Sequence, residues 1–520
     1  MTFMSTPHHR SGQMPFRRCA AAGKWSFQVA PQAPEASQIR ETVDCEAVVV
    51  GAGLGGLTAA CRLKEQGVDV VLIEKSASYS GRGGHFGVPD SSLMEAKGVR
   101  NDLKALARQW IAISGNNIDQ ELLWTFLRRS REAMDWLLPK AEASGLTPKL
   151  VDCVYPTAPY KEFYGAHSFP PTGNIRGSYV SKALYEHAQK LGVPVRFHCP
   201  AVQLIQDGAG RVVGLYAQDR EGLVRFNARL GVVLATGDIG GDQEMCKAYA
   251  PDALRTQASQ YVPAGCNTGD GHKMGLWAGG VMAEEVFPIM MHPQHFSWCS
   301  LFFLFVNKDG KRFMNEDTYV QGRATSIMRE KDGMCYSILA GDFADHMEES
   351  LKYGGGIFWG NAALAYGTQW TKDQVQASVQ RAIDTGMAVK ADTLEELADQ
   401  MDVDKDAFLR TVAEYNGFCR DKDDRQFGKR EELLFPLEKG PFVAMKLGTA
   451  LLEVVGGLAI NTKMQVLNKA RRPIPGVYAV GDTTGGMYGH EYVTTILGNS
   501  HGRALTWGYL AAEDIAASKA

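Results

Sequence analysis

Apolar and polar stretches alternate most sharply between residues 45 and 75. An apolar β-branched run at 48–50 leads into the sequence GAGLGG at 51–56; a helical pattern follows, and then a second apolar run that ends at Glu74. Runs of Val and Ile bounded by glycines are typical of buried strands. The segment therefore predicts a strand, a tight turn, a helix and a second strand, which is the arrangement of a dinucleotide-binding unit.

The glycines of this turn have separate physical roles. Gly51 permits the tight turn, Gly53 lets the backbone approach a pyrophosphate, and Gly56 lets the helix pack closely against the strand. Glu74 follows Gly51 by 23 residues, close to the spacing of about 20 at which an acidic side chain binds a ribose hydroxyl. This pattern alone does not choose between FAD and NAD.

The remaining hydrophobic pattern predicts one domain interrupted by another. Strand-like runs end at 231–234, before the sequence ATGD, and again at 476–482, before a final helix. The stretch between them is rich in aromatic residues and charged helical segments and has no nucleotide motif. We therefore predict an α/β fold in which a Rossmann-like domain is interrupted by an α+β cap. The predicted parts are a flexible extension over 1–43, the first part of the nucleotide-binding domain over 44–278, the cap over 279–432, and the second part of the nucleotide-binding domain over 433–520.

Composition and charge exclude several classes of function. The chain has 520 residues, of which 45% are hydrophobic, and a formal net charge of −3. This charge provides no basic field for nucleic acid, and no apolar run approaches the ~18–20 residues that span a bilayer. The ten cysteines contain no CxxC pair, so we expect no iron–sulfur, zinc or covalent haem site. A soluble protein of the reducing cytoplasm is expected.

Two other patterns carry less weight. His292 and His295 are three residues apart around Pro293, with no cysteine or acidic partner at ligand spacing, so we expect no metal site. Arg17 and Arg18 resemble the start of a twin-arginine export signal. No apolar core of about 7–15 residues follows them, so we do not expect export.

Six motifs stand in a fixed order: GAGLGG with Glu74, GRGGHFG at 81–87, ATGDIGG at 235–241, NTGDG at 267–271, GKRFMNE at 310–316 and GVYAVGD at 476–482. Together they resemble the flavoproteins of the fumarate reductase and 3-ketosteroid dehydrogenase superfamily. The resemblance implies a Rossmann-like FAD-binding domain of the GR2 type. FAD is expected to bind noncovalently, although covalent members use a histidine at the loop position of His85. The cofactor residues that the resemblance implies are Gly51, Gly53, Leu54, Gly56, Glu74, Lys75, Gly83, Gly84, Ala235, Thr236, Gly237, Asp270, Gly481, Asp482 and Leu497.

The resemblance also implies hydride transfer at flavin N5, with the substrate held between the two domains. Fumarate-reductase-like members carry a histidine before the GG of LLEVVGGLAI and an arginine in an NRLGGN sequence. Here the first region has Leu452 and Glu453, and the second reads VTTILGN at 493–499. A dicarboxylate needs the planar fork of an arginine. Fumarate and succinate are therefore expected to be poor substrates.

The sequence Gly489-His490-Glu491-Tyr492 is similar to the G-H-x-Y of 3-ketosteroid dehydrogenases, whose tyrosine hydroxyl hydrogen-bonds the substrate ketone. A neutral phenol can polarise a carbonyl and stabilise an enolate as charge develops. We therefore expect Tyr492 to be the main catalytic residue. His490 is expected either to orient Tyr492 or to cap the loop.

Two residues of the predicted cap are candidates for proton transfer. Arg312 matches the position that delivers a proton in fumarate-reductase-like members, and Tyr319 lies near the cap tyrosine that serves as base in the ketosteroid enzymes. Tyr319 is preferred if the substrate is a ketone, and Arg312 if it is an acid. The alternatives are a salt-bridged turn around Arg312 and a surface position for Tyr319. The aromatic residues between 296 and 305 are expected either to fill the core or to line a pocket for a bulky apolar substrate.

These residues together predict an FAD-dependent oxidoreductase that acts on a CH–CH bond next to a carbonyl. The preferred hypothesis is a 3-ketosteroid dehydrogenase-like desaturase of a bulky apolar ketone, with an external electron acceptor. An ene reductase of an unsaturated acid or enone, supplied by an external electron donor, is the alternative, and a flavoprotein subunit for electron relay is a third. An oligomer is possible. The sequence does not determine the direction of the reaction.

Overall fold

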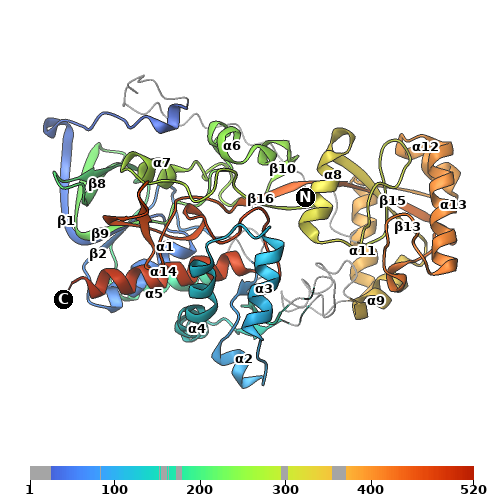
Figure 1. Cartoon of the computed structure of the whole chain (residues 1–520), viewed down its shortest axis with the longest axis horizontal. Helices are drawn as coiled ribbons and strands as arrows, with labels where there is room; N and C mark the ends of the chain where they lie inside the picture. Colours follow the sequence, from blue (N-terminus) through green and yellow to red (C-terminus); the bar gives the residue numbers. More distant parts are fainter. Residues whose placement is uncertain are drawn as a thin grey trace.

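The computed structural model shows two units at opposite ends of the long axis of the molecule (Figure 1). It describes residues 25–81, 84–151, 153, 161, 163–170, 179–293, 302–353 and 371–519. The larger unit takes segments from both ends of the chain, and the smaller one is built mainly from residues in between. This is an α/β flavoprotein fold, as the sequence predicts.

The larger unit is built on an eight-stranded sheet. Its β1 strand lies between β2 and β9, in parallel with both, so Val48 stands beside Val71 on one side and Val232 on the other. A strand in this position is covered on both faces, which explains the apolar run at 48–50. In sheet order the main strands are β17 (Gln465–Leu467), β18 (Pro473–Ala479), β9 (Leu223–Leu234), β1 (Ile39–Val50), β2 (Val70–Ile73) and β6 (Val195–Arg196), with β8 (Val212–Gln218) on β9 and β7 (Ala201–Gln206) on β8.

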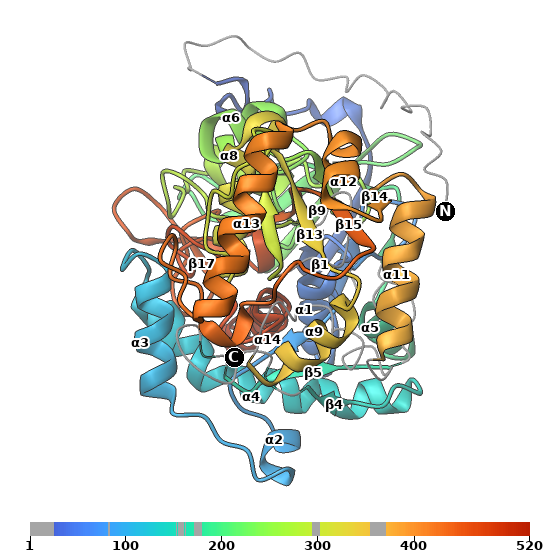
Figure 2. The ribbon, with the colours of Figure 1, turned by 90° about the vertical axis from the view of Figure 1, so that its right-hand side faces the viewer.

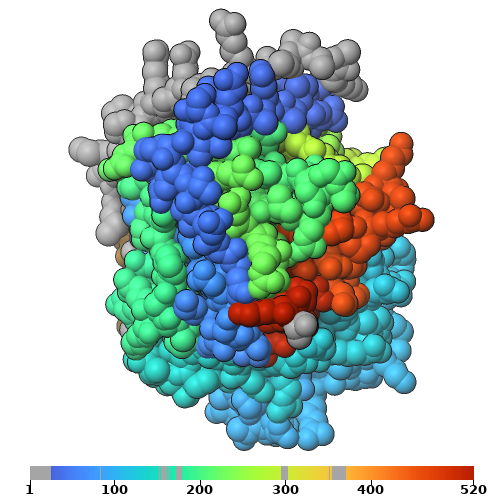
Figure 3. Space-filling view, turned by 90° about the vertical axis from the view of Figure 1, so that its left-hand side faces the viewer, coloured from blue at the N-terminus to red at the C-terminus, as the bar shows by residue number. Residues whose placement is uncertain are grey.

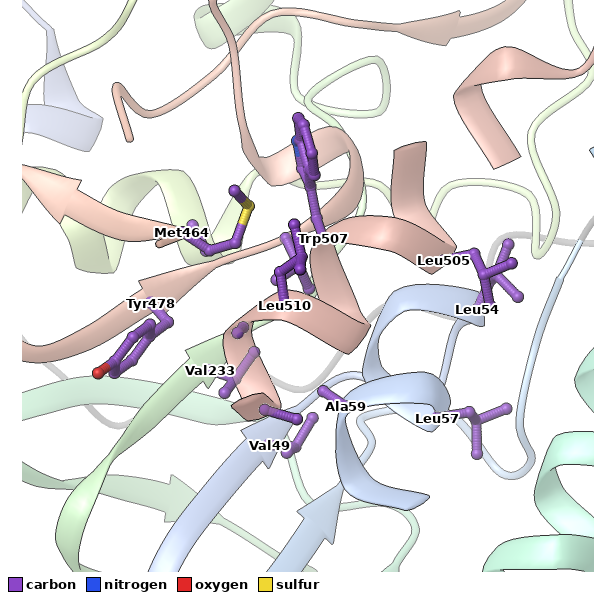
Figure 4. Close-up of a cluster of buried hydrophobic side chains, with 14 of the residues drawn as sticks. Val49, Leu54, Leu57, Ala59, Val233, Met464, Tyr478, Leu505, Trp507 and Leu510 are labelled. Carbon is purple, nitrogen blue, oxygen red and sulfur yellow. The ribbon is translucent and has the colours of Figure 1, made fainter. Parts of the chain in front are cut away.

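Helices cover this sheet, and two of them, α1 and α14, pack against each other. Between sheet and helices lies a continuous apolar core, part of which is drawn in Figure 4, where Val49 and Val233 face Ala59 and Leu510. Burying a side chain of this size stabilises the fold by about 1.5–3 kcal/mol. The helices of this unit are α1 (Leu54–Glu65), α2 (Ser92–Ala96), α3 (Leu103–Ile113), α4 (Gln120–Ala143), α5 (Tyr179–Lys190), α6 (Gln243–Tyr249), α7 (Asp270–Trp277) and α14 (Asn499–Ala517).

The smaller unit, the cap, has a four-stranded antiparallel sheet with its own apolar core. Its helices face the viewer in Figure 2. One of its strands, β15, pairs with β13 and β14, so the cap sheet extends beyond the predicted boundary at residue 432. The elements are β12 (Leu304–Val306), β13 (Met334–Leu339), β15 (Phe442–Gly448) and β14 (Ala388–Ala391), with helices α8 (Val320–Arg329), α9 (Phe343–Ser350), α11 (Lys372–Asp384), α12 (Leu394–Met401) and α13 (Lys405–Asp421).

A small sheet lies where the chain passes from the cap back to the larger unit. Its central strand, β16, begins two residues after β15 ends and pairs with β10 and β11. A further small sheet holds the segment after the glycine loop. The strands of these two sheets are β10 (Ala258–Ser259), β16 (Ala450–Val454) and β11 (Ile289–His292), and β3 (Phe86–Gly87), β5 (Ala166–Ser168) and β4 (Lys149–Leu150).

The N-terminal segment is more ordered than the predicted flexible extension. Residues 1–24 lie outside the described part of the chain, but Phe27 is 1% exposed and its carbonyl accepts a 2.8 Å hydrogen bond from Trp277 Nε1. Strand β1 begins at Ile39 and pairs with β9 from there, and these early residues, in blue, run along the face shown in Figure 3. The predicted boundary at residue 43 is therefore too late. Among the described helices, none is long and apolar enough to cross a bilayer.

Candidate functional site

The glycine loop before α1 forms one wall of a deep cavity. Gly51 has a φ of +107°, and a Cβ atom there would lie 2.3 Å from Ala235 O. A Cβ at Gly56 would lie 1.8 Å from Gly51 O, so Gly56 allows the helix to pack on the turn rather than lining the cavity. A Cβ at Gly53 would meet no protein atom within 4 Å, and Gly53 lines the cavity. The space in front of Gly53 is therefore left for a ligand.

Two charged residues at the end of β2 complete this wall. The Glu74 carboxylate accepts hydrogen bonds from Ala52 N and Ser76 N, both at 2.7 Å. Lys75 Nζ donates to Asp270 Oδ2 at 2.7 Å and so links the glycine loop to the start of α7. Glu74, Lys75 and Asp270 all line the cavity.

The opposite wall comes from the ends of β9 and β18. Among the predicted cofactor residues, those that line this side are Ala235, Thr236, Gly237, Gly481 and Asp482, and Leu54 lines the cavity from α1. Gly84 lies near His501, where its Cβ would be 3.5 Å from the ring. Leu497 lies outside the lining: its carbonyl packs against Gly87, where a Cβ would be 2.4 Å away. Gly83 falls outside the described residues.

The residues of the cavity fit FAD. The N-terminus of α1 and the bare backbone at Gly53 suit a pyrophosphate, because backbone N–H groups and the helix dipole favour negative charge. Glu74 lies where a ribose hydroxyl is expected. When bound there, FAD supplies a reversible acceptor for hydride.

At its far end the cavity is lined by residues that the cofactor motifs did not include, namely Tyr261, Leu452, Glu453, Ser500 and His501. Tyr261 follows β10, and Glu453 lies on β16, the strand with which β10 pairs. Burial, together with the charges of Asp238, Asp482 and Glu453, raises the pKa of Tyr261 well above its usual value. A polar, anionic region therefore adjoins the cofactor cavity.

Tyr492 lies directly behind this end of the cavity. It is 1% exposed, and its ring packs on Tyr488 at 5.1 Å between ring centroids. Its hydroxyl lies beside Ser500 without a well-formed hydrogen bond to any described residue. Burial and the nearby Glu453 carboxylate raise the pKa of Tyr492 well above its usual value. Tyr492 is therefore a neutral phenol next to the cavity.

Side chains of α14 hold the loop that carries Tyr492. Tyr488 Oη donates to Asn499 Oδ1 at 2.7 Å, and Asn499 Nδ2 donates to the carbonyls of Val493 and Ile496 at 2.5 and 2.8 Å. Arg503 stacks over the Tyr488 ring at 4.8 Å. This arrangement fixes the backbone on both sides of Tyr492.

Tyr319 joins the cap to the same loop. Its hydroxyl donates to Tyr492 O at 3.1 Å and accepts a short hydrogen bond from Thr494 N. Burial raises the pKa of Tyr319 well above its usual value. A hydroxyl engaged with the backbone in both directions is poorly placed to act as the base, so the geometry gives Tyr319 a positioning role.

Replacing Tyr319 with Phe is expected to lower the turnover of a ketone substrate about 10-fold, because small misplacements of reacting groups have large effects on rate. The substitution removes both hydrogen bonds to the Tyr492 loop. For a positioning residue the pH–rate profile keeps its shape, and single-turnover kinetics over a range of pH measure this. Loss of the acidic limb of the profile in Tyr319→Phe, with Tyr336→Phe in the cap as control, would instead identify Tyr319 as the base.

Arg312 is not directed at the cavity but lies in a buried ion cluster of the cap. It binds Glu316 through Nε and Nη2, at 2.9 and 2.8 Å, and Asp424 through Nη1 and Nη2, at 2.9 and 2.8 Å. Lys429 Nζ lies 3.3 Å from Glu316 Oε2. Arg312 is 5% exposed and Glu316 is fully buried. The expected proton-delivery role is therefore corrected: the guanidinium is committed to carboxylates within the cap.

His490 lies at the surface and does not line the cavity. It is exposed, its backbone N–H donates to Ser114 O at 3.2 Å, and its ring lies 3.3 Å from Asn117 Nδ2. These contacts attach the loop to the segment between α3 and α4. Because no contact joins its ring to the Tyr492 hydroxyl, the capping alternative describes it better than a catalytic role.

The remaining candidates are buried side chains or fall outside the described residues. Phe302, Phe303 and Phe305 are at most 3% exposed and belong to apolar clusters of the cap, whereas residues 294–301 fall outside the described part. His292 is buried at the end of β11. Within the described ranges no group of three or more His, Cys, Asp or Glu side chains is arranged to hold a metal ion.

Acidic side chains gather around the far end of the cavity. Asp482 pairs with Arg503 through a short contact, and burial together with Glu453 raises the pKa of Asp482 to about 7. Asp238 accepts from Gly240 N, Asn267 Nδ2 and Val454 N, and burial raises its pKa to about 7. Raised carboxyl pKa values are expected where anions share a dry site with too few cations.

Comparison with known proteins identifies the family of this chain and several similar proteins. The family model described as "FAD binding domain" matches residues 46–493. The chain is 29% identical to a urocanate reductase of Eggerthella lenta, over 90% of this chain and 73% of that protein. It is 27% identical to a 3-oxosteroid 1-dehydrogenase of Mycolicibacterium smegmatis, over 91% of this chain and 98% of that protein. It is 26% identical to a vinyl phenol reductase of Lactiplantibacillus plantarum, over 89% and 94%.

Solved structures show the same fold. A flavocytochrome c3 fumarate reductase in its open conformation superposes with a TM-score of 0.70 at 24% identity, over 93% of this chain and 79% of that one. A 3-ketosteroid-Δ4-(5α)-dehydrogenase from Rhodococcus jostii superposes with a TM-score of 0.71 at 23% identity, over 93% and 99%. Both branches of the superfamily are thus about equally similar to this chain in fold. The choice between them therefore depends on the side chains of the site.

Proposed function

Because the chain belongs to the FAD binding domain family and is an FAD-dependent oxidoreductase acting on a CH–CH group, we propose that its substrate carries an uncharged carbonyl next to the bond that changes. The proposal concerns the chemistry of the substrate, which the family leaves open. It rests mainly on the charge at the far end of the cavity.

The observation that carries this proposal is that the described lining of the cavity presents no Lys or Arg at its far end. Among the described residues that line the cavity, Lys75 is the one Lys or Arg, and it lies at the opposite end in an ion pair with Asp270. The far end presents Glu453 and Asp482 instead. Arg503 is fully buried and committed to Asp482. An anionic substrate would meet repulsion there, whereas a neutral carbonyl would not.

The buried hydroxyl of Tyr492 also supports a substrate with an uncharged carbonyl. A buried hydroxyl without a good partner costs about 1–3 kcal/mol, which a substrate carbonyl would relieve by accepting its hydrogen bond. The raised pKa keeps the phenol protonated, so it can donate to a carbonyl and stabilise the developing enolate. In this function Tyr492 polarises the carbonyl, and the loop contacts with Asn499 and Tyr319 hold it in place.

The preferred form of this function is dehydrogenation of a bulky ketone of the 3-ketosteroid type. The similarity to a 3-oxosteroid dehydrogenase spans 98% of that relative, and the buried phenol of Tyr492 beside Ser500 supports the same choice. An ene reductase of an unsaturated acid or enone is the second candidate, and the similarity to a urocanate reductase and a vinyl phenol reductase supports reduction of a carbon–carbon double bond. Either direction needs an external electron acceptor or donor. We propose that the glycine loop holds FAD without a covalent bond.

A matched pair of ligands tests the charge preference. Benzylideneacetone and cinnamate have similar shapes, but one is a neutral enone and the other a carboxylate. We expect the oxidised flavoprotein to bind the enone at least 10-fold more tightly, a difference of about 1.4 kcal/mol, as measured by perturbation of the flavin absorbance. Tighter binding of cinnamate, or saturable binding of fumarate, would contradict the proposal.

A further inference from the structure

Glu453 is an acidic residue that lines the cavity from a strand of the small sheet. It lies on β16, opposite Met290 of β11 in the small sheet between the two units. Its neighbour Val454 is held by Asp238, whose Oδ2 accepts from Val454 N at 2.7 Å. The Glu453 side chain lines the cavity with Ser500 and Tyr261. The strand therefore fixes a carboxylate at the end of the cavity where Tyr492 lies.

The charge of Glu453 acts on four ionisable groups around that end of the cavity. It is the charged group with the largest effect on the pKa of Tyr492 and of Asp482, and it also raises the pKa of Tyr261 and Tyr488. Such mutual influence requires that these groups share one region. A carboxylate and a phenol thus stand together at the site where a ketone substrate is expected.

Four other ionisable residues near this region have contacts that direct them elsewhere. The Tyr319 hydroxyl is bonded to the backbone at Tyr492 and Thr494, and Arg312 lies in the ion cluster of the cap. Asp482 is paired with Arg503. His501 lines the cavity, but its Nδ1 bonds His85 O at 2.8 Å and its ring stacks on Phe86 at 4.9 Å, which holds it toward the glycine loop.

We propose that Glu453 is the catalytic residue that moves the proton at the carbon next to the substrate carbonyl. This inference rests on the proposed function. In dehydrogenation the Glu453 carboxylate takes the proton, and the electron pair of that C–H bond becomes the new carbon–carbon π bond. FAD held by the glycine loop would supply the acceptor for the hydrogen that leaves the neighbouring carbon with its electron pair, so the substrate would lose two electrons and the flavin would gain them. In reduction the protonated Glu453 returns the proton.

This arrangement matches the needs of the reaction. The acidic C–H bond adjoins the carbonyl carbon, so the base has to lie within a few ångströms of the group that polarises the carbonyl oxygen. Glu453 lines the cavity together with Ser500, the residue beside which the Tyr492 hydroxyl lies, so the two groups stand at the same end of the cavity. The roles are then divided: Tyr492 donates a hydrogen bond and keeps its proton, and Glu453 exchanges one.

The test uses the FAD-loaded full chain and the variants Glu453→Gln and Glu453→Asp. Glutamine keeps the shape but cannot accept the proton, so we expect anaerobic flavin bleaching by a saturated ketone to slow about 100-fold or more, with partial recovery in the Asp variant. The Kd of the enone, from flavin absorbance, is expected to change less than 3-fold. Glu491→Gln, the same change one residue before Tyr492, is the matched control and is expected to bleach at the wild-type rate.

A second readout separates proton transfer from the redox step. In D2O, dithionite-reduced enzyme lacks a hydride acceptor, so it exchanges only the proton next to the ketone, which NMR detects. We expect wild type and Glu491→Gln to exchange and Glu453→Gln not to. Exchange or bleaching at the wild-type rate in Glu453→Gln would overturn the inference. Loss of both exchange and bleaching in a Glu453→Gln variant that no longer binds the enone would also overturn it, because the defect would then lie in binding. If wild type itself neither exchanges nor reacts with ketones or enones, the proposed function fails and this inference with it.

Discussion

Replacing Tyr492 with Phe is expected to lower kcat/KM for a ketone substrate by about 100- to 1000-fold, the effect of removing one preorganised donor from a developing oxyanion. Phenylalanine keeps the ring that packs on Tyr488 and removes only the buried hydroxyl. Because that hydroxyl has no well-formed partner among the described residues, its loss costs the folded protein little. The measurement is the rate of flavin reduction by the ketone under anaerobic conditions.

The control for this prediction lies on the helix that follows the loop. Tyr509 on α14 meets the Trp136 ring edge-on and lies under the Arg62 guanidinium, outside the cavity lining, so Tyr509→Phe is expected to react at close to the wild-type rate. Both variants should retain the flavin spectrum of the wild type. A Tyr492→Phe enzyme that reduces its flavin at the wild-type rate would remove Tyr492 from the mechanism.

Replacing Arg312 with Ala is expected to destabilise the protein by about 3–5 kcal/mol, the effect of leaving buried charges without their partner. Among the described residues, the substitution leaves the fully buried Glu316 with Lys429 as its ion-pair partner and leaves the nearly buried Asp424 without one. Urea unfolding followed by circular dichroism, with limited proteolysis of the cap, measures the loss. Ion pairs at the surface contribute far less, so Arg425→Ala, which removes an exposed pair with Asp421, is expected to change stability by under about 1 kcal/mol.

The same variant separates the two hypotheses for Arg312. If Arg312 organises the cap, Arg312→Ala lowers the midpoint of unfolding, and any activity that remains keeps the wild-type pH profile. If Arg312 delivers the proton to substrate, the variant retains its stability and loses turnover. The four hydrogen bonds to carboxylates favour the first outcome.

The cofactor half of the site was predictable because its determinants are local in sequence. The turn at Gly51, the bare backbone at Gly53 and the acid at Glu74 lie within one strand–helix–strand unit, so their spacing already carries the geometry. The apolar run at 48–50 also predicted a central buried strand, which β1 confirms. By contrast, strand β15 belongs to the cap sheet through pairing with β13 and β14, more than 50 residues before it, and no local pattern marks such pairing.

The substrate half depends on contacts that sequence position does not reveal. Arg312 is one of two sequence candidates for proton transfer, because nothing in its motif marks Asp424, its partner 112 residues later. Glu453 was noticed only as a departure from a family pattern. Its significance appears once β16 brings it to the cavity beside Tyr261 and Asp482. His490 shows the reverse case, since a motif match placed it next to Tyr492 in sequence while the fold turns it to the surface.

The most direct test of the central claim is to mix the FAD-loaded enzyme with candidate substrates in the absence of oxygen and follow the flavin absorbance. Oxidised enzyme is mixed with saturated 3-ketosteroids, and dithionite-reduced enzyme with enones and with unsaturated acids. The account predicts electron exchange with the uncharged carbonyl compounds, in the form of bleaching by the ketones or reoxidation by the enones, and none with fumarate. Reoxidation by unsaturated acids alone would contradict it, and silence with every compound would favour an electron-relay subunit instead.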